Sequence, residues 1–144
     1  MKFPGKIDDW PEDATGHHFH CMNFYNITNF TFTSSGIGTI DGAGQQWWGF
    51  PFIGYLDHGK GRPKMLYTQG GVNLLVENLL MINPPVNTFW AKEVDGLEIR
   101  NCEIDARRSD LDSHNDYDLS AFNTDGFDVT GKNVWIHDSR VWNQ

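Results

Sequence analysis

One pattern recurs along this chain and limits how it can fold: a Gly or Asn followed by alternating apolar and polar residues. It starts at residues 29, 73, 96 and 133, and in most cases a second short run of the same kind follows. Alternation with a period of two is typical of a strand with one buried face. Asn and Gly tolerate the left-handed backbone conformation that a tight corner requires. The pattern therefore predicts many short strands separated by sharp corners.

The spacing of these starts indicates a solenoid. The gaps are 44, 23 and 37 residues, so a rung of about 23 residues makes the first gap close to two rungs and the last gap one rung with an insertion. A repeat in the twenties is typical of units that bury their apolar faces only against their neighbours. The Leu-x-x-Leu-x-Leu framework of a leucine-rich repeat is missing. We therefore predict an all-β, right-handed parallel β-helix over residues 21–144, truncated at its end and preceded by an irregular segment over residues 1–20.

Composition limits the partners of the chain. It has 19 acidic residues against 11 Lys and Arg, a formal charge of −8, and no basic cluster, which argues against nucleic acid or an anionic membrane as partner. No apolar run reaches the ~18 residues of a transmembrane helix, and the N-terminus lacks the pattern of a signal peptide. No carboxylate or Cys completes a metal site around His17, His18 and His20 at a usual spacing. Cys21 and Cys102 allow either one disulfide or two free thiols.

Residues 123–128, with the sequence NTDGFD, are the strongest candidate for chemistry. Asp125 and Asp128 flank Gly126 and follow an Asp-rich insertion near residues 107–122. Insertions project from one face of a solenoid, often the binding face. From the residues alone, the two carboxylates could cap turns, bind calcium or act in acid–base catalysis.

Other side chains could also meet a ligand. Trp48 and Trp90 could stack on a sugar ring, although packing in or beside the solenoid is the commoner use of such aromatic residues. Arg107 and Arg108 could meet a carboxylated sugar, but pairing with nearby Asp residues on the surface is favoured over that role.

The NTDGFD stretch, followed by a strand and by WNQ at residues 142–144, resembles the first signature of the polygalacturonase family, the family 28 glycoside hydrolases. Further segments resemble the family in the same order: residues 38–48 (GTIDGAGQQWW), residues 62–63 (RP) and residues 82–90 (INPPVNTFW). In the last of these, Pro84 replaces the usual Ser. The resemblance covers about residues 27–144. It implies a right-handed β-helix that hydrolyses the α-1,4-galacturonosyl bonds of pectin with inversion.

The resemblance also implies roles for individual residues. Asp125 matches a catalytic carboxylate that helps to activate the attacking water. From the residues themselves, Asn123 could either hold the loop or contact the sugar. His114 lies in the inserted loop and could face the groove, although an exposed His in a loop usually has no specific role. Gly126 and Asp128 are predicted to shape the turn, Asp128 through bonds to backbone amides.

An inverting glycosidase needs a general acid as well as a base. The family's acid belongs to an Asp-Asp-Cys motif that follows an Asn-Gln like residues 143–144, whereas the Asp-Asp of this chain, residues 8–9, is followed by Trp10. We therefore expect an inactive fragment of a secreted, extracellular enzyme that acts on pectin, an acidic polysaccharide, as a monomer and without a cofactor. Two alternatives are a carbohydrate-binding or structural β-helix without catalysis, and a polysaccharide lyase, which needs Ca²⁺ and a basic catalytic residue.

Overall fold

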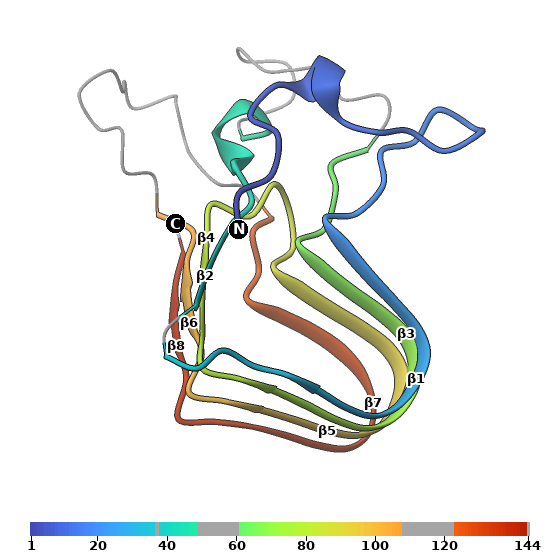
Figure 1. Cartoon of the computed structure of the whole chain (residues 1–144), viewed down its shortest axis with the longest axis vertical. Coiled ribbons are helices and arrows are strands. Elements are labelled where there is room, and N and C mark those ends of the chain that lie inside the picture. Colours follow the sequence, from blue (N-terminus) through green and yellow to red (C-terminus); the bar gives the residue numbers. More distant parts are fainter. Residues whose placement is uncertain (37, 49–60, 108–122, 144) are drawn as a thin grey trace.

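The computed structural model describes residues 1–36, 38–48, 61–107 and 123–143, and consists mainly of two parallel sheets. The first sheet has the order β1 (Met22–Phe32), β3 (Leu66–Glu77), β5 (Phe89–Arg100) and β7 (Phe127–His137). The second has the order β2 (Gly38–Asp41), β4 (Leu79–Ile82), β6 (Glu103–Asp105) and β8 (Arg140–Trp142). Each long strand is followed by a short one, so the chain winds in stacked rungs (Figure 1). This arrangement confirms the predicted parallel β-helix.

The corners of the rungs carry residues with a left-handed backbone. The four predicted starts lie at one such corner, where Asn29, Asn73, Gly96 and Asn133 have φ of 52°, 56°, 80° and 53°. The residues that follow them are in register across the sheet, and the Asn73 amide donates a hydrogen bond of 3.1 Å to Asn29 Oδ1. The side chains at this corner thus reinforce the stacking of the rungs.

An earlier corner in β1, β3 and β5 divides the long strands into two parts. It lies at Asn26, Gly70 and Glu93, all with positive φ. We call the outward side chains that precede this corner the upstream face. The downstream face consists of the outward side chains of residues 30–32, 74–77, 97–100 and 134–137. The two faces belong to the same strands but differ in their chemistry.

One part of the predicted register is wrong. β1 pairs directly with β3, residue 30 opposite residue 74, so the gap of 44 residues is one rung and not two. The additional residues lie between β2 and β3, where the 3₁₀ helix η2 (Gly44–Gln46) and the buried Trp47 and Trp48 are found. A count of residues cannot separate two rungs from one rung with an insertion. The gap of 37 residues is one rung, as predicted, because β5 pairs with β7.

The core consists of columns of apolar side chains that repeat from rung to rung. Leu74 lies beside Leu97, and Val76 lies beside Ile99, each at most 5% exposed. Parallel strands lie about 4.8 Å apart, so equivalent side chains contact each other along the column. Burial of each such side chain contributes about 1.5–3 kcal/mol, and the stacked columns hold the rungs together.

The segment before β1 covers one end of this core. Lys2 forms a parallel bridge with Asp41, which extends the second sheet by one short piece of chain. After the 3₁₀ helix η1 (Ile7–Asp9), Trp10 packs edge-on against Trp47 with ring centroids 5.5 Å apart. Within the described ranges, no helix is long and apolar enough to cross a bilayer.

Candidate active site

Asp125 lies at the entrance to β7, on a backbone that is fixed to the rung before it. Its carbonyl oxygen accepts a hydrogen bond of 2.8 Å from the amide of Thr88, and the Gly126 carbonyl accepts one of 3.1 Å from Phe89. Gly126 is buried, and a Cβ atom at this position would lie 2.9 Å from Val141 Cγ1. The Asp125 side chain is exposed. The backbone is thus held in place while the carboxylate remains open to solvent.

Asn87 joins the two carboxylates of the candidate site. Its Nδ2 donates hydrogen bonds to Asp125 Oδ2, at 3.1 Å, and to Asp128 Oδ2. A donor shared in this way holds one oxygen of each carboxylate within hydrogen-bond distance of the same nitrogen. The two side chains therefore form one acidic unit.

The turn role predicted for Asp128 is wrong. Asp128 lies inside strand β7, where it pairs in register with Trp90, and its carboxylate binds the side chain of Asn87. The sequence suggested a turn because Asp follows Gly closely, but the chain has already entered the strand at residue 127. Asp128 therefore belongs to the upstream face.

The other predicted site residues have different surroundings. Asn123 is exposed and has a φ of 57°, and the next residue, Thr124, is buried. His114 and Arg108 lie outside the described residues. The Arg107 guanidinium pairs with Asp105 at 2.6 Å, which confirms the predicted surface pairing for this residue. Its bond also lowers the pKa of the Asp105 carboxyl.

The two Trp residues singled out in the sequence have opposite environments. Trp48 is fully buried, and its Nε1 donates a hydrogen bond of 2.8 Å to the carbonyl of Pro84. Trp90 is partly exposed on the upstream face. Only Trp90 has the exposure that contact with a ligand requires.

Trp90 is covered by two ammonium groups. Lys64 Nζ lies 3.9 Å and Lys92 Nζ lies 4.7 Å from the centroid of its ring. Burial lowers the pKa of Lys64, and the positive charge of Lys92 lowers it further, while Asp128 acts in the opposite direction. The basic pair therefore lies in the electrostatic field of the acidic unit.

His20 and two Tyr residues continue this face toward the N-terminus. The His20 ring lies 4.8 Å from Tyr67, which contacts Tyr25 edge-on at 5.9 Å. The backbone amide of Lys64 donates a hydrogen bond of 3.2 Å to His20 Nδ1. Burial, followed by the charges of Lys64 and Lys92, lowers the pKa of His20 to about 4. His20 is therefore a neutral ring above that pH, with its proton on Nε2.

The three His residues near the N-terminus do not gather around one point. His17 binds Thr15, His18 binds the carbonyl of Gly61, and His20 binds the amide of Lys64. Across the part of the chain that the structure describes, no group of three His, Cys, Asp or Glu side chains could hold a metal ion. The two cysteines are free thiols.

Several residues of this face were not found from the sequence, namely Asn87, Lys64 and Lys92, and His20 was considered only as a metal ligand. Each meets its partners across rungs, and the rung lengths are unequal. Asn87 did lie in the segment of residues 82–90 that resembles the family, two residues before the start of β5. Its position opposite Asp125 follows only once β5 and β7 are paired.

An exposed carboxylate at the start of a strand, on the outer face of a parallel β-helix, is an arrangement suited to action on a polymer laid across the rungs. Comparison with known proteins agrees with this kind of protein, a parallel β-helix with an exposed acidic site. The family model described as "Glycosyl hydrolases family 28" matches residues 2–144. The chain belongs to this family.

Three of the curated relatives are fungal enzymes. The chain is 33% identical over 149 aligned positions to exopolygalacturonase A of Aspergillus niger, which covers 99% of this chain and 32% of that protein. It is 31% identical over 118 residues to a polygalacturonase of Cochliobolus carbonum, covering 81% of this chain and 30% of that protein. It is 31% identical over 137 residues to endo-xylogalacturonan hydrolase A of Aspergillus tubingensis, covering 94% of this chain and 30% of that protein. The chain thus spans about a third of the length of these relatives, and no solved structure matches it significantly.

Proposed function

We propose that this chain carries the water-activating carboxylate of an inverting glycoside hydrolase that cleaves α-1,4-galacturonosyl bonds of pectin. Asp125 is the proposed base. The observation that carries the proposal is the exposed Asp125 carboxylate on the outer face of the β-helix, bound to Asn87 Nδ2 at 3.1 Å. We propose that the enzyme is secreted, because polymeric pectin is an extracellular material. We also propose that it acts as a monomer.

A general base must be ionised and must reach the water that it activates. The hydrogen bond from Asn87 holds the carboxylate of Asp125 in position, and the exposure of this side chain allows a water molecule to approach. The backbone bonds from Thr88 and Phe89 hold the loop on the preceding rung. These features support a base that is fixed in position before the substrate binds.

A general acid requires a second carboxyl group that carries a proton. Asp128 is not suited to this role, because its Oδ2 and that of Asp125 accept hydrogen bonds from the same nitrogen. Two oxygens that share one donor lie closer together than the about 6.5–9.5 Å of an inverting pair. We therefore propose that the acid comes from another part of the full-length enzyme, and that the 144-residue chain alone does not hydrolyse pectin.

The first experiment incubates the purified chain with polygalacturonate and measures the release of reducing ends. We expect no release above the level of a heat-treated sample. Release by the chain alone would show that its own residues supply both proton transfers, and this would overturn the proposed division between base and acid.

The second experiment replaces Asp125 by Asn in the full-length enzyme. We expect kcat to fall by at least about a thousandfold, as for removal of a general base that also positions the water. Asp95→Asn is the control, because Asp95 lies on the same sheet and pairs with Asn133 away from the site. Retention of kcat in Asp125→Asn would contradict the proposal. The reaction should also give an inverted anomer without an unsaturated, ultraviolet-absorbing product, which separates hydrolysis from the lyase alternative.

A further inference from the structure

We infer that Lys64, Lys92 and Trp90 form a subsite that binds the carboxylate of a uronic-acid residue. The inference deepens the proposed function and rests on it, because it assigns one sugar unit of the same polymer to a particular place on the upstream face. The subsite lies on the rungs that precede Asp125.

The first argument is the charge of this site. Lys64 Nζ and Lys92 Nζ lie 3.9 and 4.7 Å from the centroid of one indole ring, so two positive charges are held next to each other. Among the described residues, neither ammonium group forms an ion pair within 4.0 Å. The chain has 19 acidic residues against 11 basic ones, yet among the described residues the carboxylate that acts on Lys64, Asp128, lies beyond ion-pair distance. Two neighbouring cations without such a partner are what a bound anion would neutralise.

The second argument is the apolar surface beside the cations. Tyr25 is 58% exposed, and it begins a row of aromatic contacts in which Tyr67 meets Trp90 with centroids 6.5 Å apart. A uronic acid combines a pyranose ring, whose C–H groups pack on aromatic side chains, with a carboxylate. The upstream face offers both kinds of contact in one place. A small inorganic anion would use only the cations.

The third argument is continuity with the proposed catalytic carboxylate. Trp90 in β5 pairs in register with Asp128 in β7, and Asn87 connects Asp128 to Asp125. Neighbouring strands lie about 4.8 Å apart, so the basic pair lies within about one to two strand spacings of the acidic unit. Successive sugar units of one polymer chain can cover this distance.

The test measures binding of trigalacturonate to the folded 144-residue chain by titration calorimetry. Lys64→Met and Lys92→Met should each lower the affinity at least about tenfold, the effect of losing one charge-assisted hydrogen bond. Lys132→Met is the matched control, because it removes one exposed positive charge from the same sheet, and its affinity should remain within about twofold. Binding to the unsubstituted chain should weaken at high salt and should be largely lost for the methyl-esterified trimer.

A thermal melt of each variant separates binding from folding. Because the repulsion between the two Lys side chains offsets their contacts with the Trp90 ring, the melting temperature of Lys64→Met and Lys92→Met should be nearly unchanged or raised while the affinity falls. Equal affinity for the acid and its methyl ester, unchanged affinity in the Lys variants, or an equal loss in Lys132→Met would overturn the subsite. So would the absence of binding by the folded chain, or equally effective competition by inorganic phosphate. Failure of the proposed function has a different result, namely full hydrolysis by Asp125→Asn in the full-length enzyme.

Discussion

The upstream and downstream faces belong to the same four long strands, but their charges are arranged in opposite ways. On the downstream face, Arg100 binds Glu77 at 2.8 Å and Glu98 at 2.9 Å, and Glu98 also meets His137 at 3.1 Å. On the upstream face, Lys64 and Lys92 share an indole ring without a carboxylate within ion-pair distance among the described residues. Paired charges hold strands together, whereas unpaired ones are available to a ligand.

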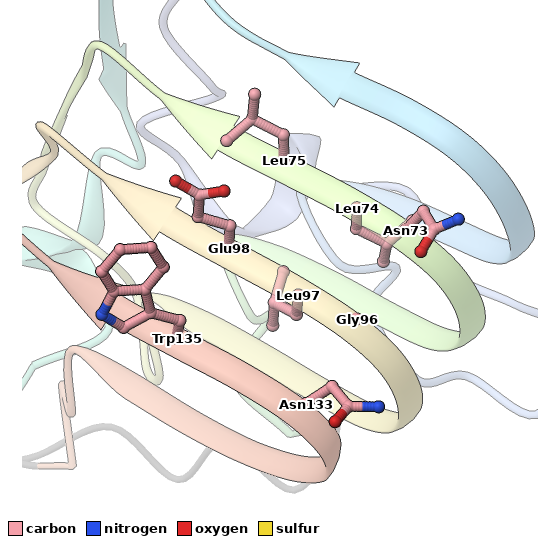
Figure 2. A pocket seen from close by; sticks show the side chains of 8 residues that line it. All are labelled: Asn73, Leu74, Leu75, Gly96, Leu97, Glu98, Asn133 and Trp135. Atoms are coloured by element: carbon pink, nitrogen blue, oxygen red, sulfur yellow. The ribbon is translucent and has the colours of Figure 1, made fainter.

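The downstream face also has a hollow of about 370 Å³, shown in Figure 2. Its lining residues are Asn73, Leu74, Leu75, Gly96, Leu97, Glu98, Asn133 and Trp135. Its carboxylate, Glu98, already binds Arg100 and His137, and Trp135 is stacked on His137 at 3.9 Å. A hollow by itself is therefore weaker support for a ligand site than unpaired groups that have been brought together.

The largest expected effect comes from removing the side chain of Asn87, whose amide joins Asp125 to Asp128. In the full-length enzyme, Asn87→Ala should lower kcat at least about tenfold, because Asp125 loses the hydrogen bond that holds its carboxylate in position. The free energy of unfolding should fall by about 1–2 kcal/mol, since a hydrogen bond to a charged group is lost at a partly exposed site. Steady-state kinetics and urea unfolding measure the two effects.

Asn87→Ser provides a graded control for this experiment. A hydroxyl group can donate one hydrogen bond where the amide donates two, so both effects should lie between those of the parent and of Asn87→Ala. If Asn87→Ala retains full kcat, the amide is only structural and the acidic unit is not a functional one.

The second prediction concerns the effect of pH on the upstream face. The pKa of His20 is lowered from an ordinary value of 6.5 to about 4. Between these values the unfolded chain binds a proton that the folded chain does not, so His20 makes stability fall as the pH decreases from about 6.5 to about 4. His20→Gln should remove this part of the pH dependence while keeping an acceptor for the Lys64 amide. Chemical unfolding at several pH values measures it, and an equally steep decline in the variant would contradict the assignment to His20.

The sequence predicted the elements of this molecule better than the contacts between them. Alternation and left-handed Asn and Gly residues identify strands and corners, because these depend on a few neighbouring residues. The pairing of β1 with β3 was missed because insertions change the rung length without changing the local pattern. For the same reason the Asp125 loop was found, but its link to Asn87, 38 residues earlier, and the meeting of Lys64 with Trp90 were not. Those contacts depend on which rung lies beside which.

The smallest predicted effect compares one cation from each face. Arg100→Met and Lys92→Met remove one positive charge from the same strand, β5. Arg100→Met loses two ion pairs, so the melting temperature of this variant should be slightly below that of the unsubstituted protein. This decrease should become smaller at high salt, because exposed pairs are screened. Lys92→Met removes the contact with the Trp90 ring but also the repulsion from Lys64, and because these two effects offset each other the melting temperature should stay the same or rise. Scanning calorimetry at low and high salt distinguishes the two signs. A decrease of the same size in both variants would mean that Lys92 is as well partnered as Arg100, and the difference between the two faces would then not lie in their charge pairing.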